Sequence, residues 1–313
     1  MIAVIFPGQG SQKAGMGQGL KESFPESKKI YDIADSLITD GMSESLSQLI
    51  AEDQEKKLTL TEYTQPAVLT VSIAAYCALK ARGLQPAWVA GHSLGEYSAH
   101  VAAGTLKFKD AVRIVRRRGR YMQEAVPVGQ GAMAAILGLD EDTVKRACLE
   151  VAEGDVVTPA NLNGGSQIVI AGEKKAVYRA VERAKALGAR RAIPLPVSAP
   201  FHCTLMRSAQ DRLEPELRVL PVSDPVYPVI ANVDAEPKRD SKSAIQALVD
   251  QVSAPVQWEA VVKRLATEGV TTYVEVGPGT VLSGLIRKIH PEAKTLHFGA
   301  PTDLPKVSSV LAS

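Results

Sequence analysis

The chain has 313 residues, of which 45% are hydrophobic and 22% charged, and its formal net charge at pH 7 is +2. This composition is typical of a globular protein long enough for one large domain or two. A charge this close to neutral argues against a dedicated nucleic-acid-binding protein, which usually carries a basic excess.

Short apolar strands alternate with helical patterns in the first part of the chain, which predicts an α/β fold with a largely parallel sheet. Two strands are expected there, at Ile2–Phe6 and Trp88–Gly91. Three helices are expected, at Gln65–Arg82, Gly95–Ala103 and Asp110–Ala125. Asp110 is the expected cap of the third helix, and Pro127 lies beyond its end.

The order of elements changes between Pro127 and Pro196. The expected sequence is strand Ala132–Leu137, helix Glu141–Val151, strands Val156–Leu162 and Gln167–Ala171, helix Lys174–Ala186 and strand Arg190–Leu195. This β-α-β-β-α-β order is that of a ferredoxin-like fold. We therefore predict a small ferredoxin-like domain at 128–196, inserted into a larger catalytic domain made of 1–127 and 197–313.

The larger domain is expected to resume after Pro196. Its remaining elements are a helix near Thr204–Leu217, a strand at Val226–Ala231, helices before and after Trp258, a strand at Thr272–Val276, a helix at Val281–Ile289 and a strand at Lys294–Phe298. The sequence shows no internal repeat, low-complexity tract or long linker.

The cysteine content and the apolar segments limit the cellular location. The three cysteines are widely spaced and form no C-x-x-C pair, so neither a disulfide framework nor a zinc cluster is predicted. The apolar start M-I-A-V-I-F is short and lacks the basic segment of a signal peptide. No apolar run approaches the roughly 20 residues of a membrane-spanning helix. We therefore expect a cytoplasmic protein that binds neither nucleic acid nor membranes.

The stretch G-H-S-L-G, between the second strand and the helix after it, contains the pattern G-x-S-x-G with Ser93 at its centre. A nucleophile elbow requires this setting, because a sharp strand-to-helix turn lifts the serine hydroxyl out of the sheet. The N–H groups at the helix N-terminus then face any oxyanion that forms beside Ser93. The alternative is an ordinary turn in which Ser93 only caps the helix, and the pattern favours the nucleophile.

A serine nucleophile needs a proton acceptor, which is usually a histidine. Of the five histidines, His202 follows an apolar stretch and directly precedes a predicted helix, a position where catalytic groups concentrate. His92 adjoins Ser93, and neighbouring side chains at a turn point apart. His202 is the predicted base, and the alternative is a histidine satisfied by packing. Spacing identifies no triad acid, so a carbonyl group is an equally good candidate for orienting the imidazole.

Arg118 is misplaced for a surface arginine. On a helical wheel, Arg113, Arg116, Arg117 and Arg120 fall within roughly 60° of Arg113, as one basic face that is usually solvated. Arg118 falls about 140° away, on the apolar side. A guanidinium stays charged, and burying it unpaired costs several kcal/mol. Arg118 therefore needs an anionic partner, which is either an internal Asp or Glu or the substrate. The following Gly119 indicates close backbone approach or tight helix packing.

Seven motifs occur in a fixed order along the chain: F-P-G-Q-G-S-Q, G-H-S-L-G-E-Y-S-A, R-G-R-Y-M-Q-E-A-V-P, N-x-N before Q-I-V-I-A-G, P-F-H-C, P-V-Q-W and V-E-V-G-P-G. This ordered set resembles the malonyl-CoA:acyl carrier protein transacylases along essentially the whole chain. The resemblance implies an α/β-hydrolase-like core with a ferredoxin-like insertion, and a place in fatty acid or polyketide synthesis.

The resemblance also implies roles for individual residues. Ser93 is similar to the acyl-accepting nucleophile of the family, His202 to its base, and Arg118 to the arginine that binds the malonyl carboxylate. Gln9 and the N–H of Leu94 are similar to the oxyanion hole.

Five further residues complete the implied site. Gln251 is similar to the residue whose backbone carbonyl orients the histidine, which would explain the missing triad acid. Asn161 and Asn163 match residues that line the site mouth on the small domain, and His92 is a further expected substrate contact. Phe201 resembles malonyl-selective members, although some members carry serine there. No metal and no resident cofactor are implied, because the CoA thioester and the carrier phosphopantetheine are substrates.

The implied reaction is ping-pong transfer of malonyl from malonyl-CoA, through a malonyl-serine, to the phosphopantetheine thiol of an acyl carrier protein. An acyl-serine thioesterase or hydrolase would share the elbow and the histidine but would not need Arg118. A nucleotide-binding protein is suggested by P-G-Q-G after the first strand, but G-x-G-x-x-G and G-K-[ST] are both missing. The basic helix face has a second interpretation here, as a surface that attracts CoA phosphates or an acidic carrier protein.

Overall fold

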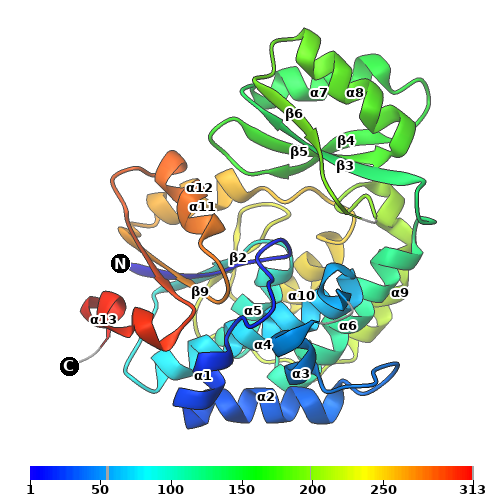
Figure 1. Ribbon diagram of the computed structural model, residues 1–313. Coiled ribbons are helices and arrows are strands. Elements are labelled where there is room, and N and C mark those ends of the chain that lie inside the picture. Colours follow the sequence, from blue (N-terminus) through cyan, green and yellow to red (C-terminus); the bar gives the residue numbers. More distant parts are fainter. Residues whose placement is uncertain (54–55, 198, 312–313) are drawn as a thin grey trace.

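The computed structural model describes residues 1–53, 56–197 and 199–311, which form a large lobe and a smaller one (Figure 1). The large lobe contains a six-stranded sheet with the strand order β10-β9-β1-β2-β7-β8. Its strands are β1 (Ile2–Phe6), β2 (Trp88–Gly91), β7 (Val229–Ile230), β8 (Pro237–Lys238), β9 (Thr272–Val276) and β10 (Lys294–Phe298). Neighbouring strands run parallel except for the β7–β8 pair. The predicted α/β fold with a largely parallel sheet is confirmed.

Helices cover this sheet and bury its central strands β1, β2, β7 and β9. They are α1 (Gln18–Ser23), α2 (Pro25–Leu37), α3 (Leu46–Glu52), α4 (Thr61–Lys80), α5 (Leu94–Ala102), α6 (Phe108–Glu124), α9 (Arg207–Arg218), α10 (Ser241–Asp250), α11 (Trp258–Thr267), α12 (Val281–Ile289) and α13 (Leu304–Val307). Single 3₁₀ turns lie at Lys57–Thr59, Thr204–Met206, Pro301–Asp303 and Ser308–Val310. Parallel strands covered on both faces read as continuous apolar runs, which is why I-A-V-I-F identifies β1.

The smaller lobe contains a four-stranded antiparallel sheet with the order β4-β5-β3-β6. Its elements are β3 (Gly131–Leu137), α7 (Glu141–Val151), β4 (Val157–Leu162), β5 (Gln167–Glu173), α8 (Lys174–Ala186) and β6 (Arg191–Pro194). The predicted β-α-β-β-α-β order is therefore present. Both helices pack on the outer face of the sheet, on the side away from the large lobe (Figure 1).

Main-chain hydrogen bonds join the two lobes at one edge of the small sheet. Val256, in the segment before α11, pairs with Asn161 of β4 as an isolated parallel bridge. The Leu162 N–H donates to the Val256 carbonyl at 2.9 Å, and the Val256 N–H donates to the Ala160 carbonyl at 2.9 Å. The end of β4 is thereby held against the large lobe.

Two details of the prediction are wrong. Helix α6 begins at Phe108 with Lys107 at its cap, and Asp110 lies in its first turn, where a carboxylate still favours the helix N-terminus. The strand expected over Val226–Ala231 is reduced to β7, because Pro228 interrupts that stretch, Pro225 directly precedes it, and proline cannot donate to a sheet. The helices expected before and after Trp258 are present as α10 and α11, and α11 begins at Trp258 itself.

The length and hydropathy of each helix decide whether it could span a membrane. Across the described ranges, none of the helices combines the length and the apolar character needed to span a bilayer.

Candidate active site

Ser93 occupies the sharp turn between β2 and α5. Its backbone has φ 51° and ψ −107°, a strained conformation for a residue with a side chain and one that a nucleophile elbow imposes. Glycines on both sides make the turn possible. A Cβ on Gly91 would lie 2.0 Å from the Gly95 carbonyl, and a Cβ on Gly95 would lie 2.1 Å from the Phe6 oxygen. The strand and the helix therefore pass at backbone contact, and the turn carries the serine outward.

The Ser93 hydroxyl is bound to His202 and does not cap the helix. Ser93 Oγ lies 2.7 Å from His202 Nε2, and His202 Nδ1 lies 3.0 Å from the backbone oxygen of Gln251. Because a carbonyl can only accept, Nδ1 carries the proton and Nε2 is free to accept the serine proton. The structure thus brings together the predicted nucleophile, the predicted base and a carbonyl in place of a triad acid.

His202 is almost fully buried, with 3% of its surface exposed. Burial, followed by the positive charge of Arg118, lowers the pKa of His202 to about 3. The imidazole is therefore neutral at physiological pH, as a general base must be. The neighbouring Cys203 is buried and donates its thiol to the Pro200 carbonyl at 3.1 Å, in agreement with the interpretation of a small buried cysteine.

The other histidines have different surroundings. His92 Nε2 lies 2.8 Å from Asn163 Oδ1 and so connects the elbow to the small lobe. His100 is buried inside α5, where desolvation lowers its pKa to about 3. His290 contacts the Tyr273 hydroxyl at 3.1 Å. Of the candidates, His202 is the one bound to the serine.

Arg118 is buried, with 1% of its surface exposed, beside the nucleophile. Its Nη1 donates to Gln65 Oε1 at 2.9 Å, and its Nη2 donates to Gln251 Oε1 at 2.8 Å and to Ser93 Oγ at 3.2 Å. The guanidinium carbon lies 5.4 Å from the centre of the Tyr97 ring. Among the described residues, Arg118 forms no ion pair, so the internal Asp or Glu considered as an alternative is not its direct partner. The buried cation instead holds two neutral amide oxygens next to the serine.

Gly119 sets the position of Arg118 through helix packing. A Cβ on Gly119 would lie 2.6 Å from the Thr61 carbonyl oxygen and 2.8 Å from the Glu62 Cα. Helices α4 and α6 therefore meet at backbone contact, as one of the two interpretations of this glycine predicts. This contact places Arg118 within reach of Gln65 on α4.

A cavity of about 130 Å³ lies over the serine. It is lined by Gln9, Gln65, His92, Ser93, Arg118, Met122, Met133, Asn161, Leu195, Val197, Phe201 and His202. Most predicted site residues therefore line one space. Asn163 and Gln251 lie behind this lining, where they contact His92 and His202 respectively.

The two residues expected to form the oxyanion hole come from different loops. Leu94 is the first residue of α5, and an N–H in that position has no partner within the helix. Gln9 follows β1, and its side-chain amide donates to Thr61 Oγ1 at 3.2 Å. The two loops lie in close contact, because a Cβ on Gly8 would come within 2.4 Å of the His92 oxygen.

Three site residues are missing from the sequence-based prediction. They are Gln65, Glu96 and Asn232, all buried polar residues. Asn232 Oδ1 accepts the Ser93 N–H at 2.7 Å, and its Nδ2 donates to the Gly91 carbonyl at 2.7 Å. Gln65 and Glu96 stand out as polar residues in apolar helices, and Asn232 lies two residues after the end of β7, where parallel strands of α/β proteins place functional groups. These signals could have identified them.

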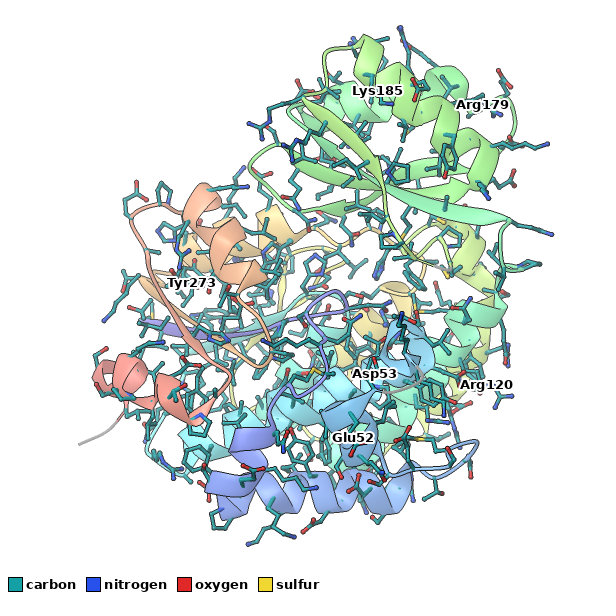
Figure 2. The ribbon with its side chains drawn as sticks, in the orientation of Figure 1. Glu52, Asp53, Arg120, Arg179, Lys185 and Tyr273 are labelled. Carbon is teal, nitrogen blue, oxygen red and sulfur yellow. The ribbon has the colours of Figure 1, made fainter. Side chains whose placement is uncertain are left out.

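The basic face of α6 is largely paired within the chain. Arg117 forms an ion pair with Glu216 of α9, and Arg120 forms one with Glu124 at 2.8 Å. Arg116 donates to the Asp40 carbonyl. Figure 2 shows Arg120 on the outer surface, and its side chain is 66% exposed. The helical wheel therefore separates this face correctly from the buried Arg118.

Comparisons with known proteins identify relatives along nearly the whole chain. The family model of the acyl transferase domain matches residues 4–296. The malonyl CoA-acyl carrier protein transacylase of Bacillus subtilis is 48% identical over 301 residues, which cover 96% of this chain and 94% of that protein. The protein of the same name from Escherichia coli K12 is 47% identical over 289 residues, which cover 92% of each chain.

Solved structures are similar over the whole chain. A malonyl CoA-acyl carrier protein transacylase from Coxiella burnetii has a TM-score of 0.95 and 40% identity, and covers 100% of this chain and 98% of its own. A malonyl-transacylase in complex with a type II polyketide synthase acyl-carrier protein has a TM-score of 0.94 and 42% identity, and covers 97% and 98% of the two chains.

Proposed function

The chain belongs to the malonyl CoA-acyl carrier protein transacylases of the acyl transferase domain family, and on this premise we propose that it transfers malonyl from malonyl-CoA to an acyl carrier protein through a malonyl ester of Ser93. The observation that carries the proposal is the position of Arg118. A buried guanidinium, held by neutral amides and 3.2 Å from the serine hydroxyl, suits a substrate that brings its own carboxylate.

The first half-reaction makes the malonyl-serine. His202 Nε2 takes the Ser93 proton while Ser93 Oγ attacks the thioester carbonyl. The N–H of Leu94 and an N–H of Gln9 stabilise the negative oxygen of the tetrahedral intermediate. Because the Gln9 side chain is bound to Thr61, the backbone N–H is the donor we assign. The intermediate collapses, the C–S bond breaks, and His202 returns the proton to the leaving CoA thiolate.

The second half-reaction runs the same steps with a different thiol. The phosphopantetheine thiol of the carrier protein gives its proton to His202 Nε2 and attacks the malonyl ester. The C–O bond to Ser93 breaks, and the protonated His202 returns the proton to the serine oxygen. Free enzyme and malonyl-carrier are the products, so no water or resident cofactor enters the reaction. The absence of a metal or cofactor, like the cytoplasmic location, remains a prediction.

Arg118 selects the acyl group in this scheme. It pairs with the free carboxylate of the malonyl ester, and an acyl group without a carboxylate leaves the buried cation without an anion. His92, Asn161, Asn163 and Phe201 are the further residues that we assign to substrate contact, since they line the cavity or hold one of its walls.

We also propose the finer description of the fold. Residues 128–196 form a ferredoxin-like domain, and residues 1–127 and 197–313 form an α/β-hydrolase-like catalytic domain. The sheet order β4-β5-β3-β6 with both helices on one face supports the first assignment. The elbow between a buried parallel strand and a helix supports the second.

Mass spectrometry of the intact protein tests the proposed function. After exposure to malonyl-CoA, the wild type is expected to gain the mass of one malonyl group, and Ser93→Ala to gain none. Adding carrier protein should remove the adduct and yield malonyl-carrier. Free malonate as the main product would identify a hydrolase, and an unmodified wild type would contradict the malonyl-serine.

A further inference from the structure

Glu96 is a buried carboxylate directly below the nucleophile elbow. It is the third residue of α5, three positions after Ser93, and its side chain is fully buried. A carboxylate in such a place is costly unless it is hydrogen-bonded. The mechanism above gives Glu96 no task, so its contacts have to explain it.

One carboxylate oxygen of Glu96 binds two groups of the site. Glu96 Oε2 accepts from Gln251 Nε2 at 2.7 Å and from the Asn232 N–H at 2.9 Å. The other oxygen, Oε1, faces the His100 ring, 4.0 Å from Nε2. The hydrogen bonds of Glu96 therefore run towards the catalytic residues.

Gln251 connects Glu96 to the base and to the arginine. Its Oε1 accepts from Arg118, its Nε2 donates to Glu96 and to the Ser93 carbonyl at 3.1 Å, and its backbone oxygen accepts from His202 Nδ1. Asn232 connects Glu96 to the nucleophile, because its Oδ1 accepts the Ser93 N–H. Ser93, His202 and Arg118 are thus each connected to Glu96 through a single residue, Ser93 by its backbone N–H and the other two by their side chains.

Taking the proposed function as given, we propose that Glu96 is a positioning residue, whose Oε2 fixes the Gln251 amide so that the amide oxygen faces Arg118. A carboxylate oxygen that accepts requires the NH₂ end of the Gln251 amide on its side. The oxygen end is then the one available to the guanidinium. The reverse orientation would place NH₂ donors against the donors of Arg118 and leave Glu96 without that bond.

The role requires an acceptor and not a negative charge. Burial raises the pKa of Glu96 to about 7, although the bonds from Asn232 and Gln251 lower it. A proton on the carboxyl goes to Oε1, on the His100 side, because Oε2 already receives two donors. Oε2 accepts in both protonation states, so a glutamine amide oxygen can replace it.

The ratio of kcat/KM for malonyl-CoA to that for acetyl-CoA is the readout, because only malonyl transfer uses the carboxylate site of Arg118. Glu96→Leu, which has similar bulk and no acceptor, is expected to lower this ratio between about 10-fold and 100-fold, in the range that misplacement of a site group produces. The loss should lie in kcat, with the carrier-protein KM unchanged. Glu96→Gln should recover most of the wild-type ratio.

Glu275 supplies the matched control. It is a second buried carboxylate, and it accepts the N–H groups of Leu282 and Ser283 at 3.1 and 2.7 Å, outside the cavity lining. Glu275→Leu should lower the melting temperature as Glu96→Leu does and leave the malonyl-to-acetyl ratio at its wild-type value. An unchanged ratio in Glu96→Leu, an equal fall in Glu275→Leu, or a glutamine variant as defective as the leucine variant would overturn the inference.

A second route avoids dependence on the fold of Glu96→Leu. Gln251→Met keeps the backbone carbonyl that orients His202 but removes the amide oxygen, so it should reproduce the fall in the ratio. An unchanged ratio in Gln251→Met would refute the path from Glu96 to Arg118. Wild-type malonyl transfer is measured in the same assay, so an inactive wild type would count against the proposed function and not against the role of Glu96.

Discussion

Removing the Arg118 guanidinium is expected to damage malonyl transfer much more than acetyl transfer. In the free enzyme Arg118 holds two neutral amide oxygens, of Gln65 and Gln251. These two bonds stay in place when malonyl binds, and the malonyl carboxylate pairs with the remaining N–H groups of the guanidinium. Truncating one partner of a buried, hydrogen-bonded charge pair costs about 2–5 kcal/mol, which corresponds to a fall in kcat/KM for malonyl-CoA of about 30-fold to 5,000-fold in Arg118→Ala. Much of this loss is the penalty of leaving the malonyl carboxylate buried without a partner.

Acetyl transfer measures the part of the effect that does not depend on the carboxylate. Acetyl-CoA loses only the contact between Arg118 and the Ser93 hydroxyl, so its kcat/KM should fall less than about 10-fold. The assay compares transfer from the two CoA thioesters to carrier protein for the wild type, Arg118→Ala and Arg120→Ala. Arg120 lies two residues further along α6 with its side chain 66% exposed, and its loss should change neither rate. Equal losses of malonyl and acetyl transfer in Arg118→Ala would refute the carboxylate clamp.

Three further predictions concern stability and pH. Gly119→Ala should lower the free energy of unfolding by about 1–3 kcal/mol, because its Cβ would lie 2.6 Å from the Thr61 oxygen. In the control Gly284→Ala the new Cβ meets open space, so this variant should be neutral or stabilising. Equal denaturation midpoints for the two variants would contradict the close packing of α4 on α6. Because its pKa is lowered to about 3, His202 should stay neutral, so Ser93 inactivation by a sulfonyl fluoride should hardly change from about pH 7.5 to about pH 5. A midpoint near the ordinary histidine pKa would argue against a buried neutral base. Arg117→Ala removes an exposed ion pair and should cost less than about 1 kcal/mol in thermal unfolding, with unchanged malonyl transfer.

The parts of the fold that could be predicted are those with a local signal. Strands β1, β2 and β9 are apolar runs bounded by glycine, proline or charge, and the structure gives them the predicted bounds. The bounds of α7 and α8 also agree, because each follows a strand and has a clear amphipathic pattern. Helices α1 to α3 are absent from the sequence-based prediction. Strand β7 is short for a reason outside its own composition, since the prolines around it limit its pairing.

Some residues of the site could likewise be predicted from the sequence around them, whereas others depend on contacts between distant parts of the chain. The elbow of Ser93 is local, and the wheel isolates Arg118 within a single helix. The partners are not local: His202 lies 109 positions from Ser93, and Gln251 lies 133 from Arg118. Spacing could rank the histidines but could not measure their distance to the serine. Glu96 lies inside the motif G-H-S-L-G-E-Y-S-A, but its role cannot be predicted from that motif because it depends on Asn232 and Gln251, which only the folded chain brings to it.

The bridge between β4 and Val256 has a mechanical consequence for how substrates enter. Strand β4 is an edge of the small sheet, and two main-chain bonds from Val256 tie it to the large lobe beside Asn161. A rotation of the small lobe that keeps these bonds must pivot about that line. Asn161 in β4 therefore stays fixed, whereas Leu195, which follows the opposite edge strand β6, is the lining residue of the small lobe that such a rotation moves furthest. The same bonds cover part of an unpaired strand edge that would otherwise be open to pairing with another chain.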